Sequence, residues 1–204
     1  MASDPLEFTL PSVLSHVWQT LKSPRDMAKR IMTIDLPTPV LWELVTAIVL
    51  VSVIMGQLGT LAIAPDLAQI DDYFLANPLV MAVLQLALVV FTVFATFFIG
   101  RIFGGKGQLR DSLLLLTWLQ LVMMCLQVVQ TVLLIVAPGL GQLATVFGLF
   151  LFLWLYTIFT AEMHGFKSVP AVFVMILVSA FGISFVLTLI LTALGVSVTG
   201  AVHV

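Results

Sequence analysis

The residues best suited to bind a charged ligand form a glycine-rich segment with two basic side chains. Its spacing, Gly-x-x-x-x-Gly-Lys, is that of a phosphate-binding loop, but a glycine stands where such a loop needs a hydroxyl to hold magnesium. The segment also follows a long apolar run, whereas a phosphate-binding loop follows a strand. We therefore interpret it as a tight turn in which glycines permit positive φ and close backbone contact. Its candidate interaction residues are Gly100, Arg101, Gly104, Gly105, Lys106 and Gly107.

A second candidate site is a polar stripe within an apolar run at 112–136. At 100° per residue, Thr117, Gln120, Gln127 and Thr131 share one helix face, and Gln130 lies beside it. Amides are costly against lipid, so this face should point into a helix bundle or across an oligomer contact. Two alternatives stay open at this point: hydrogen bonding between helices, or a polar cavity for a small molecule or lipid.

The remaining polar residues do not assemble a catalytic or metal site. Glu162 and His164 are too few for a metal ion, which needs three or more converging ligands. No Ser-His-Asp or Cys-His set can be brought together, and the single Cys125 allows no intrachain disulfide. No ionisable side chain stands near the middle of an apolar run, which weakens an ion-coupled transporter. We expect a protein without enzymatic activity, metal or cofactor.

The composition places these residues in a membrane protein. Of 204 residues, 61% are hydrophobic and 9% are charged. Soluble domains are roughly 45–50% apolar and about 25% charged. So few charges cannot cover a soluble globule, and the composition excludes a soluble enzyme, a disordered chain and a nucleic-acid-binding domain.

Five apolar runs are long enough to cross the hydrocarbon core of a bilayer. They do not alternate as barrel strands do, so each must form a helix that satisfies its own backbone hydrogen bonds. The predicted fold is all-α and polytopic. Its expected transmembrane helices cover residues 41–64, 78–103, 112–136, 142–161 and 170–194.

The distribution of charge predicts the orientation of these helices. All eight basic residues precede the first run or lie between runs two and three or four and five. The loop between runs one and two instead carries Asp66, Asp71 and Asp72. Basic residues stay on the cytoplasmic side, so the N-terminus is expected inside and the C-terminus outside.

Residues 1–40 are expected to form a cytoplasmic amphipathic segment in front of a membrane domain at 41–204. Two short helices are predicted there, the second beginning at Ser23-Pro24. Two interpretations stay open: helices on the inner membrane surface, or helices packed under the bundle. The residues expected at the membrane surface are Trp18, Lys22, Arg25, Lys29 and Arg30.

This layout resembles the Yip family, whose members are named for their interaction with small GTPases. The most telling segments are residues 99–107, similar to the arginine and Gly-Gly loop of bacterial Yip-domain proteins, and residues 164–168 before the last run. The resemblance extends from about Leu21 to Leu194. It implies an all-helical membrane protein without catalysis, and in eukaryotic members a role in vesicle trafficking.

The chain departs from the eukaryotic members, because it shows neither their long cytosolic N-terminal region nor an Asp-Leu-Tyr-Gly-Pro motif. The resemblance therefore favours the bacterial branch, in the inner membrane, and does not favour GTPase binding. Our first functional hypothesis is a scaffold or interaction protein that contacts the bilayer, further copies of itself or other membrane proteins. The alternative is a conduit for a small molecule or lipid along the polar face of the third run.

Overall fold

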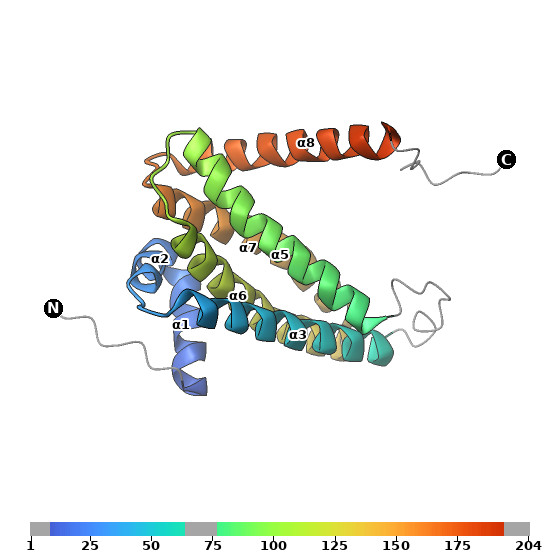
Figure 1. Ribbon diagram of the computed structural model, residues 1–204. Coiled ribbons are helices and arrows are strands. Elements are labelled where there is room, and N and C mark those ends of the chain that lie inside the picture. Colours follow the sequence, from blue (N-terminus) through green and yellow to red (C-terminus); the bar gives the residue numbers. More distant parts are fainter. Residues whose placement is uncertain (1–8, 64–76, 194–204) are drawn as a thin grey trace.

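A computed structural model describes residues 9–63 and 77–193, and this part of the chain consists of helices and short connections (Figure 1). Two short helices come first and five long ones follow. They are α1 (Leu10–Lys22), α2 (Pro24–Met32), α3 (Thr38–Ile63), α5 (Pro78–Ile102), α6 (Leu109–Val136), α7 (Pro138–His164) and α8 (Val169–Ala193).

The five long helices are each apolar and long enough to cross a membrane. The prediction of an all-helical protein with five transmembrane helices is confirmed. The expected boundaries differ from the observed ones by at most four residues, and those at Pro78 and Val136 agree. The largest difference is at α7, which begins at Pro138 and not at 142, because a proline fits the first turn of a helix where no N–H donor is needed.

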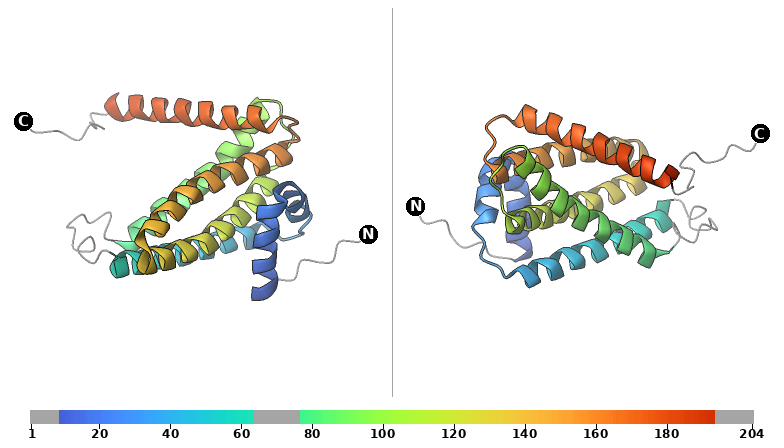
Figure 2. Two further views of the ribbon diagram at one scale, coloured as in Figure 1. Left: turned by 180° about the vertical axis from the view of Figure 1, so that it is seen from behind. Right: turned by 45° about the horizontal axis from the view of Figure 1, so that its top comes forward.

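Helix α6 lies at the centre of the bundle, between α3, α5 and α7 (Figures 1 and 2). Every residue from Ser112 to Leu119 is buried, so this part of α6 is surrounded on all sides. On α3, a stripe of Leu41, Val45 and Val49 at four-residue spacing is buried in the same core. The hydroxyl of Ser112 donates to the Val93 carbonyl oxygen at 2.8 Å and ties α6 to α5.

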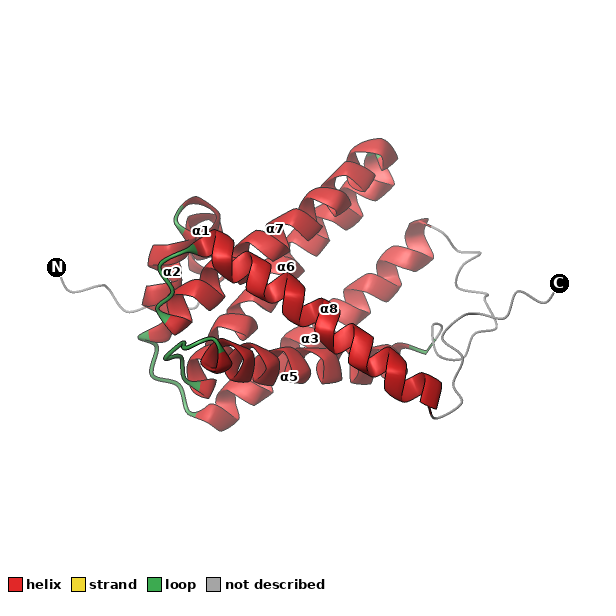
Figure 3. Cartoon of the chain, turned by 90° about the horizontal axis from the view of Figure 1, so that it is seen from above, coloured by secondary structure: helices red, strands yellow, loops and turns green. Residues whose placement is uncertain are grey.

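Helix α8 leaves the bundle soon after it begins. Its buried contacts lie in its first two turns, where Val172 and Met175 form a small cluster with Ala161 of α7. Beyond this cluster α8 diverges from α7 and crosses above α5 (Figure 3). The fold therefore combines a closed group of helices with one splayed helix.

Helices α1 and α2 lie at the end of the bundle where the α5–α6 and α7–α8 connections also lie (Figure 1). All eight basic residues are at this end, which we call the basic end. Its placement in the cytoplasm stays a prediction. The acidic loop expected between the first two spans falls at 64–76, outside the described residues.

Candidate functional site

The glycine-rich segment begins as the C-terminal cap of α5. Gly104 has a left-handed φ of +86°, and its N–H donates to the Arg101 carbonyl at 3.0 Å. The N–H of Gly105 reaches back to the Gly100 carbonyl at 2.8 Å. This pair of bonds is a Schellman motif, which ends a helix while satisfying its last carbonyls. The expected tight turn is therefore a helix cap.

Helix α7 ends in the same way at the same end of the bundle. Gly165 has a φ of +71°, and its N–H donates to the Glu162 carbonyl at 3.3 Å. The Phe166 N–H donates to the Ala161 carbonyl at 2.9 Å, and Phe166 packs against the cluster that contains Ala161. The last helical residue before this cap is His164.

The imidazole of His164 joins the two caps. The Gly107 N–H donates to Nδ1 at 3.2 Å, so Nδ1 acts as an acceptor. Nε2, which lies 3.1 Å from the Thr96 carbonyl oxygen, must then carry the proton and donate it. The backbone carbonyl of His164 also accepts from the Lys106 N–H at 3.2 Å. These contacts fix a neutral, buried histidine between α5, α7 and the glycine segment.

Three glycines make room for this histidine. A Cβ atom at Gly100 or Gly105 would overlap the imidazole ring, and one at Gly107 would lie 2.9 Å from both Nδ1 and the Met163 side chain. The missing side chains of these glycines therefore leave the space that the His164 side chain of α7 occupies. The segment's N–H groups at positions 106 and 107 are occupied by His164, which leaves them unable to cradle a phosphate.

Neither basic side chain of the segment makes a hydrogen bond to His164. Arg101 and Lys106 are exposed, and the Arg101 guanidinium lies 5.5 Å from the centre of the Phe97 ring. The structure thus divides the first candidate site into a glycine cradle for His164 and two exposed cations.

The polar stripe of α6 is also divided. Gln127 donates to the Ser52 carbonyl of α3 at 3.0 Å, and Gln130 donates to the Ala144 carbonyl of α7 at 2.8 Å. Thr131 packs against α3, where the nearest glycine, Gly59, leaves it space. These three side chains link α6 to its neighbours, as polar residues in membrane interiors commonly do.

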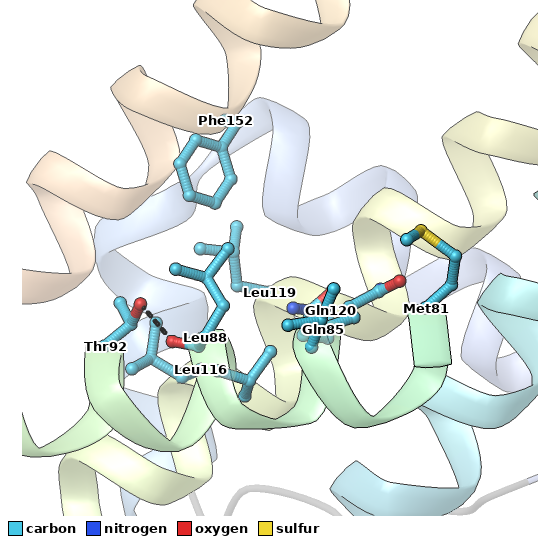
Figure 4. A pocket seen from close by; sticks show the side chains of 10 residues that line it. Met81, Gln85, Leu88, Thr92, Leu116, Leu119, Gln120 and Phe152 are labelled. Atoms are coloured by element: carbon cyan, nitrogen blue, oxygen red, sulfur yellow. Dashed lines mark hydrogen bonds between the residues drawn. The ribbon is translucent and has the colours of Figure 1, made fainter. Parts of the chain in front are cut away.

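The two remaining stripe residues have other environments. Thr117 is buried and donates to the Leu113 carbonyl of its own helix at 2.7 Å. Gln120 lines a cavity of about 500 Å³ between α5, α6 and α7, together with Gln85 of α5 (Figure 4). Neither glutamine amide makes a hydrogen bond to any other described residue. The other walls are mainly apolar.

The side of helix α1 that faces the bundle is mixed, since the apolar Val17 and Leu21 pack against the main core beside buried polar residues. The Trp118 indole of α6 donates to the hydroxyl of Thr20 at 3.0 Å, and both side chains are buried. On the opposite face of α1, Leu14 and Trp18 are 56% and 59% exposed. The Lys22 ammonium lies 5.1 Å from the centre of the Trp18 ring, in a cation–π geometry.

Helix α2 packs beneath the bundle. Its Met27, Ala28 and Ile31 belong to the main core. Three of the residues expected at the membrane surface belong to α2. The side chains of Arg25 and Lys29 lie 3.4 Å and 3.7 Å from the Glu162 carboxylate of α7. Arg30 is half-buried.

The whole arrangement, from α1 to the splayed α8, can be compared with known families. A family model described as the Yip1 domain matches residues 18–195. The chain belongs to the Yip1 domain family. No curated protein and no solved structure matches the chain.

The Yip1 domain match includes both partners of the central contact, the glycine segment and His164. The chain is therefore a multi-pass membrane protein of this family in which two distant motifs meet. Within the described ranges, no three histidine, cysteine, aspartate or glutamate side chains are grouped to hold a metal ion. The sequence did not single out His164 for this contact, since Gly107 and His164 are 57 positions apart. Only the co-occurrence of two glycine-ended helices could have suggested it.

Proposed function

We propose that this Yip1 domain protein is a non-enzymatic scaffold of the bacterial inner membrane that holds partners at its basic end. The partners are further copies of the chain or other membrane proteins. The observation that carries this proposal is the orientation of α1. On α1, the buried His16 and Thr20 face the bundle beside Val17 and Leu21, and the large apolar residues Leu14 and Trp18 face away from it.

A surface of this kind is unusual for a helix that only packs in place. Burying His16 and Thr20 while exposing a leucine and a tryptophan leaves apolar area outside the protein. Tryptophan is enriched both at contacts between proteins and at membrane surfaces, because its ring is large and amphipathic. The outward face of α1 therefore suits a partner contact next to the membrane.

The attachment of α1 and α2 to the bundle gives this surface a fixed position. Trp118 bonds to Thr20 of α1, and Glu162 pairs with two cations of α2. A partner bound to α1 would be held in register with the transmembrane helices. This is the property that a scaffold needs, in contrast to a tail on a flexible tether.

The proposal is tested on the full chain purified in mild detergent, with the mass of the particle as the measurement. The wild-type protein should appear as a homo-oligomer or with a retained membrane protein. The double variant Leu14→Ala/Trp18→Ala should lose that association. The matched control is Leu149→Ala/Trp154→Ala, which removes an exposed leucine and an exposed tryptophan from α7. A wild-type monomer without a partner, or equal loss in both double variants, would contradict the proposal.

A second candidate function, a lipid or small-molecule conduit, is favoured by the cavity that Gln85 and Gln120 line. Gln127 and Gln130 do not contribute to it, because their amides bond to neighbouring helices. The test is the movement of a fluorescent phospholipid across proteoliposomes. The double variant Gln85→Leu/Gln120→Leu should slow that movement, and an unchanged rate would remove this candidate.

A further inference from the structure

Three adjacent cavities follow the inner side of α8. The first, about 360 Å³, is at the basic end and is lined by Phe103, Lys167 and Met175. The second, about 390 Å³, lies between α5, α7 and α8 and shares Met175 with the first. The third, about 470 Å³, lies between α5 and α8 and shares Ala95 and Ile183 with the second. Together they form one groove, which we call the α8 groove.

The wall of the α8 groove is mainly apolar, and it includes hydroxyl groups from α5, α7 and α8. On α5, Thr96 donates to the Thr92 carbonyl at 2.6 Å, so the Tyr156 hydroxyl, 2.7 Å from the Thr96 oxygen, must be the donor of that pair. Thr92 and Thr160 likewise donate to carbonyls of their own helices. Every hydroxyl proton that α5 and α7 bring to the groove is thus satisfied within the protein. The α5 and α7 sides of the groove therefore suit a hydrocarbon chain better than a polar solute.

The basic end of the α8 groove has the opposite character. Lys167 is the one charged side chain among the described residues that line the three cavities. The exposed Arg101 and Lys106 belong to the adjacent glycine segment. An anion at this end would meet positive charge and no lining carboxylate.

We propose that the α8 groove binds a phospholipid with an anionic headgroup, with an acyl chain between α5 and α8 and the phosphate beside Lys167. The groove has the same polarity as such a lipid, charged at one end and apolar along the rest. A helix from a second copy fits less well. The eight basic residues at this end outnumber its described acidic residues, so a second copy in the same orientation would bring net positive charge toward Lys167.

The proposal is tested by native mass spectrometry of the full chain with phosphatidylglycerol or phosphatidylcholine of identical acyl chains. The wild-type protein should retain phosphatidylglycerol in preference. Lys167→Ala should reduce this preference about fivefold, because one cation near a membrane surface contributes about that factor. Lys167→Arg should preserve it.

Steric variants test the other end of the groove. Ala95→Phe should reduce retention of both lipids, because Ala95 lines two of the three cavities. Gly182→Leu should do the same from α8, where a Cβ has open space and no clash is expected. The matched control is Ala87→Phe, on the exposed face of α5 outside these cavities. Unfolding midpoints measured in parallel identify any variant that fails to fold.

Two results would overturn the proposal. The first is equal retention of the two lipids by the wild-type protein, with no effect of Lys167→Ala. The second is loss of a dimer in Ala95→Phe and Gly182→Leu while lipid retention stays at the wild-type level, which would assign the groove to a second copy. Both results can be told apart from failure of the scaffold proposal, because that proposal depends on Leu14 and Trp18.

Discussion

Helices α7 and α8 are neighbours in the chain and are both strongly apolar, yet they are packed very differently. The most apolar stretch of α8 has a mean hydropathy of 2.6, and 6% of its residues are buried. The corresponding stretch of α7 has a mean hydropathy of 2.0, and 39% of its residues are buried. In this protein, the more apolar helix is therefore the less buried one.

This difference shows what holds helices together inside a membrane. Lipid chains are as apolar as leucine, so hydrophobicity inserts a helix but does not pack it against another. Close packing depends on small residues and hydrogen bonds. Helix α7 has both where it meets α6, at Gly148 and at the bond between Gln130 and the Ala144 carbonyl. Among the described residues, no hydrogen bond joins α8 to α5 across the α8 groove.

His164 is where the closed and the open parts of the molecule join. It ends α7, bonds to α5 through Thr96 and to the glycine segment through Gly107. Helix α8 begins five residues later, at Val169. The contact between His164 and the glycines therefore sets both the distance from α5 to α7 and the position from which α8 departs.

The largest expected effect comes from breaking this junction. In Gly100→Ala, the added methyl group overlaps the imidazole, and α5 must move away from α7. Overpacking of this kind costs about 1–3 kcal/mol, and strained hydrogen bonds at His164 add to it. We expect a clearly lower thermal unfolding midpoint in detergent.

The matched control for this variant is Gly139→Ala, since a Cβ at Gly139 meets no other atom within 4 Å. Its unfolding midpoint should stay near the wild-type value. In a double-mutant cycle, His164→Ala should remove most of the extra cost of Gly100→Ala, because the clash requires the ring. Additive effects of the two substitutions would show that the glycine cradle is not what Gly100 provides.

A smaller effect is expected from the glutamines of α6. Gln130→Leu keeps the side-chain volume nearly constant but removes the bond to the Ala144 carbonyl. Such bonds in membrane interiors contribute about 0.6 kcal/mol and rarely more than about 1.7 kcal/mol. Gln120→Leu should leave stability unchanged or slightly higher, since its amide has no partner among the described residues. Equal losses of unfolding free energy in the two variants would contradict the division of the stripe.

The five spans could be predicted from the sequence because apolar length and charge placement are local properties. The polar stripe of α6 was also visible, since helical periodicity places Gln120 and Gln127 on one face. Periodicity cannot tell which amide will find a carbonyl on a neighbouring helix, as Gln127 finds that of Ser52. The role of His164 was hidden for the same reason. It depends on two helix ends meeting in space, which no local pattern records.

The ion pairs beneath the bundle should matter less than the bonds within it. Glu162→Gln weakens the contacts of Arg25 and Lys29, whose side chains are 53% and 64% exposed. Because solvent and salt screen such pairs, we expect a loss of only about 0.2–0.5 kcal/mol. Hydrogen exchange of α2 should rise in the variant at low ionic strength, and the difference from wild type should shrink with added salt. An effect that is independent of salt would indicate a packing role for Glu162.

The smallest expected effect is a pH dependence of α1. Burial of His16, and then the nearby Arg30 guanidinium, hold the pKa of that imidazole below its usual value of 6.5. In the unfolded or undocked state the ring takes up a proton more readily. The stability that a neutral His16 contributes is therefore fully present above pH 6.5 and is lost as the pH falls toward the lower folded pKa.

Hydrogen exchange of α1 should accordingly be faster at a pH below 6.5 than above it, after correction for the intrinsic rate. His16→Leu should remove this difference, because the buried position then holds no titrating group. The variant also keeps the contact between Thr20 and Trp118, so α1 should remain docked. A pH dependence that persists in His16→Leu would move the titrating group elsewhere. Its disappearance would show that the protonation of His16 controls how firmly α1 docks, and so how firmly Leu14 and Trp18 are held outward.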